Sequence, residues 1–349
     1  MVENEKNIPK KGRIAWFAPD LIEGSGGHRT IFQNANELIK RGYACDLIIK
    51  PIWRPMLPNE IYNNIKEWYG DFDGDVFNDY NLVRDYDMVI ATGWETASPA
   101  ADTNIKRKLY FMQDYEPWFF AMGVPYLLAK KTYEYDLFPV AIGHYLPEKM
   151  KQDYKKDAGQ FDFCADLTQY YKKKDVKKEN AICFVYQPSK PRRCAEMGMK
   201  ALQIVQKLRP DVKIYLFGSP KMVPYNIEAE HLGILPIEKC NDLYNSCKVG
   251  LCLSTTNPSR VPFEMMAAGL PVVELGLENN LYDFPEDGCL LVELSPEAIA
   301  NAILKILDDE KLAKRLSDGG VKYMKKYPLD KGYEQFGKII DTIFEGRKC

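Results

Sequence analysis

Three loops of this sequence place residue types that can bind a ligand at the start of a helical pattern. The first is Glu23-Gly-Ser-Gly-Gly-His-Arg-Thr30, which follows an apolar run. Gly26 and Gly27 allow a ligand to approach the backbone, and the free N–H groups of a helix start favour anionic oxygen. His28, beside these glycines, can hydrogen-bond a bound ligand or cap the helix. The loop fits neither the G-x-G-x-x-G nor the P-loop spacing, because Arg29 fills the third glycine's place and no Gly-Lys pair follows.

The second loop is Tyr186-Gln-Pro-Ser-Lys-Pro-Arg-Arg193. Ser189 can cap the next helix and Pro191 can start it, which leaves Arg192 and Arg193 at the positive end of the helix dipole. Two cations are unfavourable there unless an anion lies between them. The pattern therefore predicts a bound diphosphate, with ordinary surface arginines as the alternative.

The third loop lies between Ser254 and Val273 and joins an apolar run to a short helix and a further strand. Glu264 falls in the first helical turn, where the helix dipole stabilises a carboxylate. Such a carboxylate can accept hydrogen bonds from a vicinal diol such as that of ribose. A simple interaction with the helix dipole is the alternative interpretation.

The composition excludes several classes of partner. The 349 residues carry 47 basic and 49 acidic side chains and a formal net charge of −2, so we expect no global attraction to nucleic acid. No apolar run approaches the roughly 18 residues that a membrane span needs. The nine cysteines form no C-x-x-C pair, and we expect them to be reduced thiols of a cytoplasmic protein.

The elements that position these loops alternate between short apolar runs and helical periodicity, a pattern typical of βα units around parallel sheets. Ligands of such sheets bind beyond the carboxyl ends of the strands, where the three loops fall. In the first half, a helix is expected from His28 to Arg41, and Gly42 ends it. The strands of this half are expected near 13–19, 44–50, 87–92, 108–113 and 139–143.

The second half repeats the pattern, which predicts a second doubly wound sheet. A helix is expected near 192–208, and the amphipathic segment 330–345 is expected to pack back on the first domain. The strands are expected near 181–186, 213–218, 231–235, 249–254, 271–275 and 289–293. We therefore predict a first Rossmann-like domain at 1–175, a second at 176–329, and a returning C-terminal helix at 330–349.

One passage of the second half resembles the nucleotide-sugar half of family 4 glycosyltransferases. It runs from His231-Leu-Gly-Ile-Leu through Val249-Gly-Leu-Cys-Leu-Ser254 to Pro262-Phe-Glu-Met-Met-Ala-Ala-Gly-Leu-Pro-Val-Val273. The Gly-Ser-Gly-Gly-His loop and the string Gln113-Asp-Tyr-Glu-Pro117 extend the likeness to the first half. Together these motifs are similar to the WsaF-type rhamnosyltransferases of bacterial surface polysaccharides.

This resemblance implies a GT-B fold, in which two Rossmann-like domains face a cleft. It implies a retaining, metal-independent transfer of a hexose or 6-deoxyhexose, such as L-rhamnose from dTDP-L-rhamnose, to a glycan or lipid-linked glycan. Glu264 matches the glutamate that holds the donor's ribose, and Arg192 falls where the family has its phosphate-binding lysine. From the residues, we expect His28, Arg192 and Glu116 to be catalytic. Glu116 would orient acceptor hydroxyls, with a structural turn as the alternative. The expected donor-binding residues are Gly26, Gly27, Gln187, Lys190, Arg192, Arg193, Gly218, Asn257, Ser259, Arg260 and Glu264.

Two positions depart from the family pattern. Gln187 replaces the arginine that pairs with the phosphate-binding lysine, and Thr256 replaces the first glutamate of the Glu-x7-Glu motif. Arg193, Lys190 and Arg260 are available to replace the missing cation. Because the first glutamate contacts sugar hydroxyls in the family, its loss fits a 6-deoxyhexose donor, or alternatively a nucleotide-sugar binding module without turnover.

Other functions are less well supported by the residues. The run Asp71-Phe-Asp-Gly-Asp75 contains the D-x-D of metal-dependent transferases, but its glycine is misplaced for a calcium loop, and we interpret it as a surface loop. A nicotinamide oxidoreductase is disfavoured by the failed dinucleotide fingerprint. No cofactor is expected besides the donor. We interpret the lysine-rich run that ends at Asn180 as the solvated approach to an interdomain linker, and a peripheral contact with the inner face of the membrane is the alternative.

Overall fold

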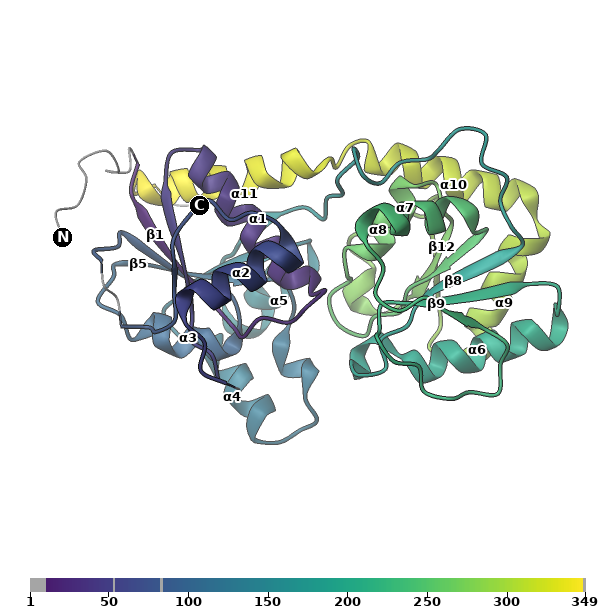
Figure 1. Ribbon diagram of the computed structural model, residues 1–349, viewed down its shortest axis with the longest axis horizontal. Coiled ribbons are helices and arrows are strands. Elements are labelled where there is room, and N and C mark those ends of the chain that lie inside the picture. The colour runs from purple at the N-terminus through teal and green to yellow at the C-terminus, as the bar shows by residue number, and fades with distance from the viewer. Residues whose placement is uncertain (1–10, 53, 82–83, 348–349) are drawn as a thin grey trace. The chain divides into compact units, whose positions relative to one another are not determined.

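The computed structural model describes residues 11–52, 54–81 and 84–347. The chain divides into two compact units (Figure 1). Unit 1 comprises Met1–Ile142, Leu146–Phe161 and Tyr333–Cys349, and unit 2 comprises Gly143–Tyr145 and Asp162–Gly332. Within the described ranges, no helix is long and apolar enough to cross a membrane.

Unit 1 is built on a seven-stranded sheet in the order β3-β2-β1-β4-β5-β6-β7, with every pair parallel. The order reverses between β1 and β4, which makes this the switch point of a doubly wound sheet. The central strands are buried, as expected where helices cover both faces. The strands are β1 (Arg13–Ala18), β2 (Ala44–Ile49), β3 (Val76–Phe77), β4 (Met88–Ala91), β5 (Arg107–Met112), β6 (Phe138–Ile142) and β7 (Gly159–Phe161).

The helices of unit 1 connect successive strands of this sheet. The first helix, α1 (Gly26–Lys40), begins after Ser25, whose hydroxyl accepts a hydrogen bond from His28 N. It ends at Lys40, and Gly42, with φ +101°, lies just beyond its C-terminus. Gly42 suits this place because a positive φ is strained for other residues. The elements are α1 (Gly26–Lys40), α2 (Pro58–Tyr69), α3 (Trp94–Ala101), the 3₁₀ helix η2 (Glu116–Phe119), α4 (Val124–Thr132) and α5 (Tyr145–Tyr154).

The C-terminal helix α11 (Leu329–Phe344) supplies the last segment of unit 1, as the sequence predicts. Its apolar face carries Phe336, which is 1% exposed and contacts the rings of Trp16, Phe111 and Phe161. This helix therefore completes the core of unit 1, although it lies at the other end of the chain from β1 (Figure 1).

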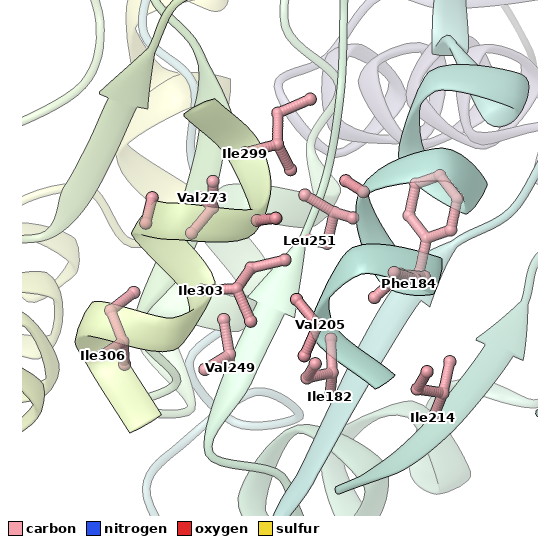
Figure 2. Packing of buried hydrophobic residues seen from close by; sticks show 14 of the residues in the cluster. Ile182, Phe184, Val205, Ile214, Val249, Leu251, Val273, Ile299, Ile303 and Ile306 are labelled. Carbon is pink, nitrogen blue, oxygen red and sulfur yellow. The ribbon is translucent and has the colours of Figure 1, made fainter. Parts of the chain in front are cut away.

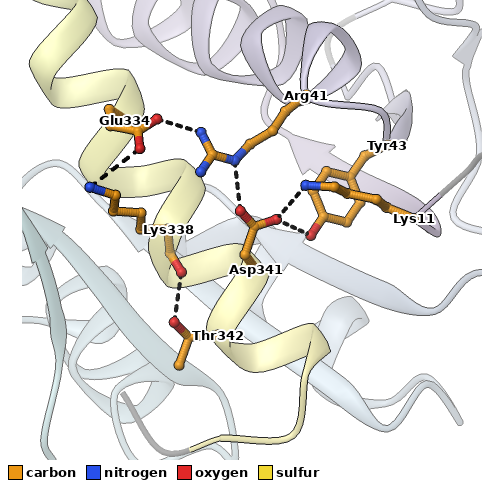
Figure 3. A network of polar contacts seen from close by, with 7 residues as sticks. All are labelled: Lys11, Arg41, Tyr43, Glu334, Lys338, Asp341 and Thr342. Atoms are coloured by element: carbon orange, nitrogen blue, oxygen red, sulfur yellow. Dashed lines mark hydrogen bonds and ion pairs between the residues drawn. The ribbon is translucent and has the colours of Figure 1, made fainter.

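A polar network fastens the other side of α11 (Figure 3). Asp341 accepts hydrogen bonds from Arg41 Nε at 2.8 Å, Tyr43 Oη at 2.7 Å and Lys11 Nζ at 3.0 Å. Arg41 also pairs with Glu334 at 2.6 Å. Burial would raise the pKa of Asp341, but the hydrogen bonds from Tyr43, Arg41 and Lys11 outweigh it and lower the pKa. The carboxylate is thus charged in the folded state at neutral pH.

Replacing Phe336 by alanine should lower the free energy of unfolding of unit 1 by about 3–5 kcal/mol, because a fully buried aromatic ring leaves a cavity. Urea denaturation followed by circular dichroism measures the change. Lys338→Ala on the same helix is the control, since its side chain is 70% exposed and should change stability by less than about 0.5 kcal/mol. Equal effects of the two substitutions would contradict the packing described for α11.

Unit 2 contains a six-stranded parallel sheet in the order β10-β9-β8-β11-β12-β13. Its order again reverses at one place, between β8 and β11. The strands are β8 (Ala181–Val185), β9 (Lys213–Phe217), β10 (Glu230–His231), β11 (Val249–Leu251), β12 (Val272–Leu275) and β13 (Cys289–Val292). The helices are α6 (Ala195–Leu208), α7 (Ile237–Ser246), α8 (Val261–Ala267), α9 (Pro296–Asp308) and α10 (Glu310–Met324), with the 3₁₀ turns η3 (Pro191–Arg193) and η4 (Glu278–Asn280).

The main core of unit 2 lies between this sheet and the helices α6 and α9 (Figure 2). Gly198 of α6 allows close packing on β8, because a Cβ there would come within 2.3 Å of the Phe184 ring. The labelled residues of this core are Ile182, Phe184, Val205, Ile214, Val249, Leu251, Val273, Ile299, Ile303 and Ile306. This packed layer holds β8 and β11 side by side, and their loops with them.

The GT-B fold class predicted from the sequence is confirmed, with small shifts of the element ends. The helix expected from residue 192 begins at Ala195, since Cys194 adopts a left-handed conformation with φ 47° and separates it from η3. The strand expected at 231–235 is confined to β10. The periodicity did not predict α2, β3 or β7, which are short or only partly buried and so carry weak patterns.

Candidate functional site

The switch point of unit 2 brings two of the predicted loops together. β8 and β11 are neighbours, with Phe184 opposite Leu251, so the segments that follow them leave the sheet at the same edge. The first segment leads into η3 and the second into α8. A hydrogen bond from Thr255 N to Arg192 O, 3.0 Å long, joins the two segments directly.

The turn η3 presents three cationic residues, Lys190, Arg192 and Arg193. Its backbone is held by hydrogen bonds from Arg193 N to Lys190 O at 2.9 Å and from Cys194 N to Pro191 O at 3.0 Å. Ser189, which we expected to cap the following helix, is exposed, and Lys190 stands at the start of the turn. The cations therefore belong to a separate turn before α6 rather than to the first turn of that helix.

These cations lie close enough to repel one another. Burial, together with the charges of Arg192 and Arg193, lowers the pKa of Lys190 to about 8. Arg192 is partly exposed, whereas Arg193 is 9% exposed. An arrangement of like charges at a loop end is unfavourable alone and becomes favourable when an anion binds.

Glu264 lies in the first turn of α8 and is 2% exposed. Arg260 stands at the N-cap of this helix, and Asn257 in the preceding loop is fully buried. The Ser259 hydroxyl accepts a hydrogen bond from Val261 N at 3.2 Å, so this predicted donor-binding residue has a capping contact at the start of α8. The loop thus brings four of the predicted donor-binding residues to one helix start.

Gln187 and Gly218 lie close together beyond the carboxyl ends of β8 and β9, at the same edge of the sheet. Gly218 follows β9 with φ +95°, and a Cβ built on it would lie 3.5 Å from Gln187 Nε2. Its N–H donates to Gly233 O at 2.8 Å. Gly218 therefore forms a turn that other residues adopt with strain, with the Gln187 amide above it.

A buried polar network that we did not predict supports the loop after β11. Glu274 Oε1 accepts hydrogen bonds from Ser254 N and Leu275 N, each at 2.7 Å. The Asn280 amide donates to Ser254 O at 3.0 Å, and the Asn279 amide donates to Thr256 O. The available sequence signal was a glutamate inside the apolar run of β12, which is costly to bury without such partners.

Glu274 also lies near the base of the cationic turn. Burial raises the pKa of Glu274 to about 8, while its backbone hydrogen bonds and the charge of Arg193 act in the opposite direction. Glu274 Oε2 and Arg193 Nη1 each lack a hydrogen-bond partner among the residues that the structure describes. At neutral pH the carboxyl group keeps its proton, so it does not neutralise Arg193.

The buried Glu274 should make unit 2 less stable as the pH rises. Between pH 4.5, the ordinary pKa of a glutamate, and about pH 8, the side chain of Glu274 ionises in the unfolded protein but keeps its proton in the folded protein. The free energy of unfolding therefore falls as the pH rises through this range and levels off above about pH 8. In Glu274→Gln, the melting temperature should therefore fall less between about pH 6 and pH 9 than in the unmodified protein.

Differential scanning calorimetry across this pH range provides the measurement. Glu297→Gln is the matched control, because Glu297 is exposed on α9 in the same unit. It should follow the unmodified protein. If Glu274→Gln also follows it, Glu274 is ionised in the folded state and the assignment of its pKa is wrong.

In unit 1 the predicted residues of the first loop lie beyond β1, at the switch point of that sheet. A Cβ built on Gly26 would meet no atom within 4 Å, so the space above it is open. His28 is 4% exposed, and its ring nitrogens lie 3.0 Å from Ser25 Oγ and 3.3 Å from Pro19 O. Burial lowers the pKa of His28, which is thus a neutral ring that holds the start of α1.

Glu116, in η2 of unit 1, is also buried. Its Oε2 accepts a hydrogen bond from Trp94 N at 2.7 Å, at the start of α3, and Tyr110 Oη lies 3.4 Å from Oε1. Burial raises the pKa of Glu116 to about 8. These contacts place Glu116 at a helix N-terminus, where it positions α3.

The acidic run after α2 contacts cations of the chain itself. Asp71 pairs with Lys66 at 3.2 Å and Asp75 with Arg84 at 2.6 Å. Gly74 is required by close packing, since a Cβ there would lie 1.9 Å from Cys45 O. Among the described residues, no group of three or more His, Cys, Asp or Glu side chains is arranged to hold a metal ion.

Solved structures share this architecture, which defines the GT-B class. The chain is similar to TarM of S. aureus, in complex with Fondaparinux, alpha-GlcNAc-glycerol and UDP, with TM-score 0.75, 10% identity, and coverage of 95% of this chain and 100% of the other. It is similar to Anabaena HepE in complex with UDP-glucose, with TM-score 0.73, 12% identity and coverage of 95% and 100%. It is also similar to WaaG, a glycosyltransferase involved in lipopolysaccharide biosynthesis, with TM-score 0.67, 13% identity, and coverage of 94% of this chain and 99% of the other.

The family follows from the sequence comparisons. The WsaF N-terminal domain matches residues 71–143 and the WsaF C-terminal domain matches residues 180–304, which together exceed half of the chain. The chain therefore belongs to the WsaF family of GT-B glycosyltransferases. It is also 29% identical over 329 residues to the O-antigen biosynthesis protein RfbC of Myxococcus xanthus. That match covers 88% of this chain and 25% of RfbC, so the chain spans about a quarter of that relative's length.

Proposed function

We propose that unit 2 binds a nucleoside diphosphate sugar, with the diphosphate at the η3 turn and the ribose at Glu264. The observation that carries this proposal is the contact between the two loops, since Thr255 N donates to the carbonyl of Arg192 itself. A diphosphate needs cations and free N–H groups, and a ribose needs a carboxylate or similar acceptor for its two hydroxyls. Both chemistries meet at the carboxyl ends of β8 and β11.

Within this proposal Lys190 and Arg192 are the cations that contact the diphosphate. Burial and the repulsion from Arg192 and Arg193 lower the pKa of Lys190. A bound anion would offset the repulsion and so favour the protonated lysine. Arg193, which is buried beside Glu274, adds positive potential from beneath the turn. Gln187 and Gly218, at the neighbouring strand β9, would border the same ligand.

The transfer breaks the bond between the anomeric carbon and the diphosphate oxygen, and it forms a bond from that carbon to an acceptor hydroxyl. In the retaining reaction proposed here, the acceptor proton moves to the departing phosphate oxygen. No carboxylate nucleophile is required. The protein's part is to stabilise the negative charge that grows on the diphosphate, which is the task of Lys190 and Arg192.

For the substrates, we propose a 6-deoxyhexose donor such as dTDP-L-rhamnose and a surface-polysaccharide acceptor. The donor proposal rests on Thr256, which offers no carboxylate where the family pattern has its first glutamate. The acceptor proposal rests on the similarity to RfbC, an O-antigen biosynthesis protein. The open space above Gly26 makes the α1 loop of unit 1 the proposed acceptor-binding segment. The cytoplasmic location stays a prediction from the cysteine pattern.

A binding module without turnover is the second candidate, because Gln187 and Thr256 both depart from the family pattern. Calorimetric titration with dTDP-rhamnose, UDP-sugars and GDP-sugars identifies the nucleotide. Release of the nucleoside diphosphate in the presence of a glycan acceptor then separates the two functions. Binding followed by release supports the transferase, binding without release supports the module, and no binding of any sugar nucleotide contradicts both.

Arg192→Ala should lower turnover by about 10²- to 10³-fold, since one charge-stabilising donor typically contributes that much. The melting temperature should change little, because Arg192 is partly exposed. Arg315→Ala is the matched control, as Arg315 is an exposed arginine on α10 of the same unit. Unchanged turnover of the Arg192 variant at saturating donor would remove this residue from the mechanism.

A further inference from the structure

An apolar surface on unit 1 has no role in the proposed function. It is formed by five side chains of η2, α4 and the segment between them, and we call it the α4 surface. Its members are Trp118 at 36% exposure, Met122 at 76%, Val124 at 68%, Leu127 at 57% and Leu128 at 49%. Large apolar side chains exposed singly are common, but five within eleven consecutive residues form a patch that indicates a contact.

The register of α4 separates an inward from an outward face. Ala129 and Thr132 are buried and anchor the helix on unit 1. Val124, Leu127 and Lys131 follow one another at intervals of three and four residues, so they lie along one exposed stripe of the helix. The outward face is therefore apolar in its first turns and cationic in its last.

Contacts with the rest of unit 1 hold the α4 surface in place. α4 packs on η2 and α3. Trp118 contacts the Tyr115 ring edge-on at 4.9 Å, and Lys149 Nζ lies 4.8 Å from the centre of the Trp118 ring. A surface fixed in this way meets a partner without the loss of conformational freedom that a mobile segment would suffer.

The charges beside the α4 surface are basic. Lys130 and Lys131 are both exposed, and among the described residues neither takes part in an ion pair at 4.0 Å or less. The acidic residues that follow, Glu134 and Asp136, act on Lys156: burial lowers the pKa of Lys156, and the two negative charges oppose this effect. Apolar side chains and a tryptophan, followed by two exposed lysines at the end of α4, match the interface of an anionic membrane.

We propose that the α4 surface docks on the surface of a membrane that contains anionic lipid. Met122, Val124 and Leu127 would enter the boundary between headgroups and acyl chains, and Lys130 and Lys131 would contact the phosphates. A second copy of the chain or another protein fits the apolar part equally well, but it does not account for two exposed lysines that form no ion pair with the acidic residues of the described ranges. This proposal assigns the membrane contact to unit 1, independently of the donor site.

Co-sedimentation of the full chain with vesicles tests this docking. Vesicles of phosphatidylcholine with about 30% phosphatidylglycerol should bind the protein, and binding should weaken as the salt concentration rises. Leu127→Glu should lower the bound fraction at least about tenfold, because a charge enters the apolar contact. Leu208→Glu is the matched control, since Leu208 is 59% exposed against 57% for Leu127 and lies in unit 2; it should bind as the unmodified protein does.

Lys130→Gln with Lys131→Gln should remove the preference for anionic over neutral vesicles and leave folding intact, since both residues are exposed. Absence of binding to anionic vesicles by the unmodified protein would overturn the proposal, as would equal binding of Leu127→Glu and Leu208→Glu. A dimer in light scattering that Leu127→Glu dissociates, without vesicle binding, would assign the surface to a second copy instead. Calorimetric titration of the same samples with sugar nucleotides tests the proposed function separately, because the proposed donor site lies in unit 2 and the α4 surface in unit 1.

Discussion

The organisation of the proposed donor site depends on one contact, the hydrogen bond between Thr255 N and the carbonyl of Arg192. It forms because β8 and β11 are adjacent parallel strands, whose following segments must leave the sheet at the same edge. If these strands were not neighbours, the cationic turn and the helix that carries Glu264 would not be in contact. Because they are neighbours, three positive charges and a buried carboxylate lie at the reversal point of a parallel sheet, where open sheets bind their ligands.

Maintaining this contact requires polar groups in the interior of unit 2. The side chains of Glu274, Asn279 and Asn280 hydrogen-bond the backbone of the loop after β11 and so hold it from the interior of unit 2. A protonated Glu274 leaves the positive charge of Arg193 without compensation from this carboxyl group. Both features favour the binding of a polyanion. A loop that is already held in place loses little conformational freedom when the ligand binds, and the positive charge beneath the turn is not neutralised by the protein itself.

Unit 1 is organised differently. Its predicted residues His28 and Glu116 are buried and hold the starts of α1 and α3, and the open position lies at Gly26. Its core is completed by Phe336 from the C-terminal helix, and Asp341 fastens that helix to Arg41 and Tyr43. The unit is thus rigid at the base of its loops, while its exposed apolar surface lies on α4.

The sequence by itself determined the fold class, most of the strands, the returning helix and the three loops, because apolar periodicity and turn residues are local properties. It also determined that Glu264 starts a helix and that cations stand near 190–193. Only the tertiary structure decided which loops touch, that His28 and Glu116 are buried, and that Glu274 supports the site. These facts depend on which strands are neighbours and on which side chains lose contact with water, and both arise from contacts between residues far apart in the chain.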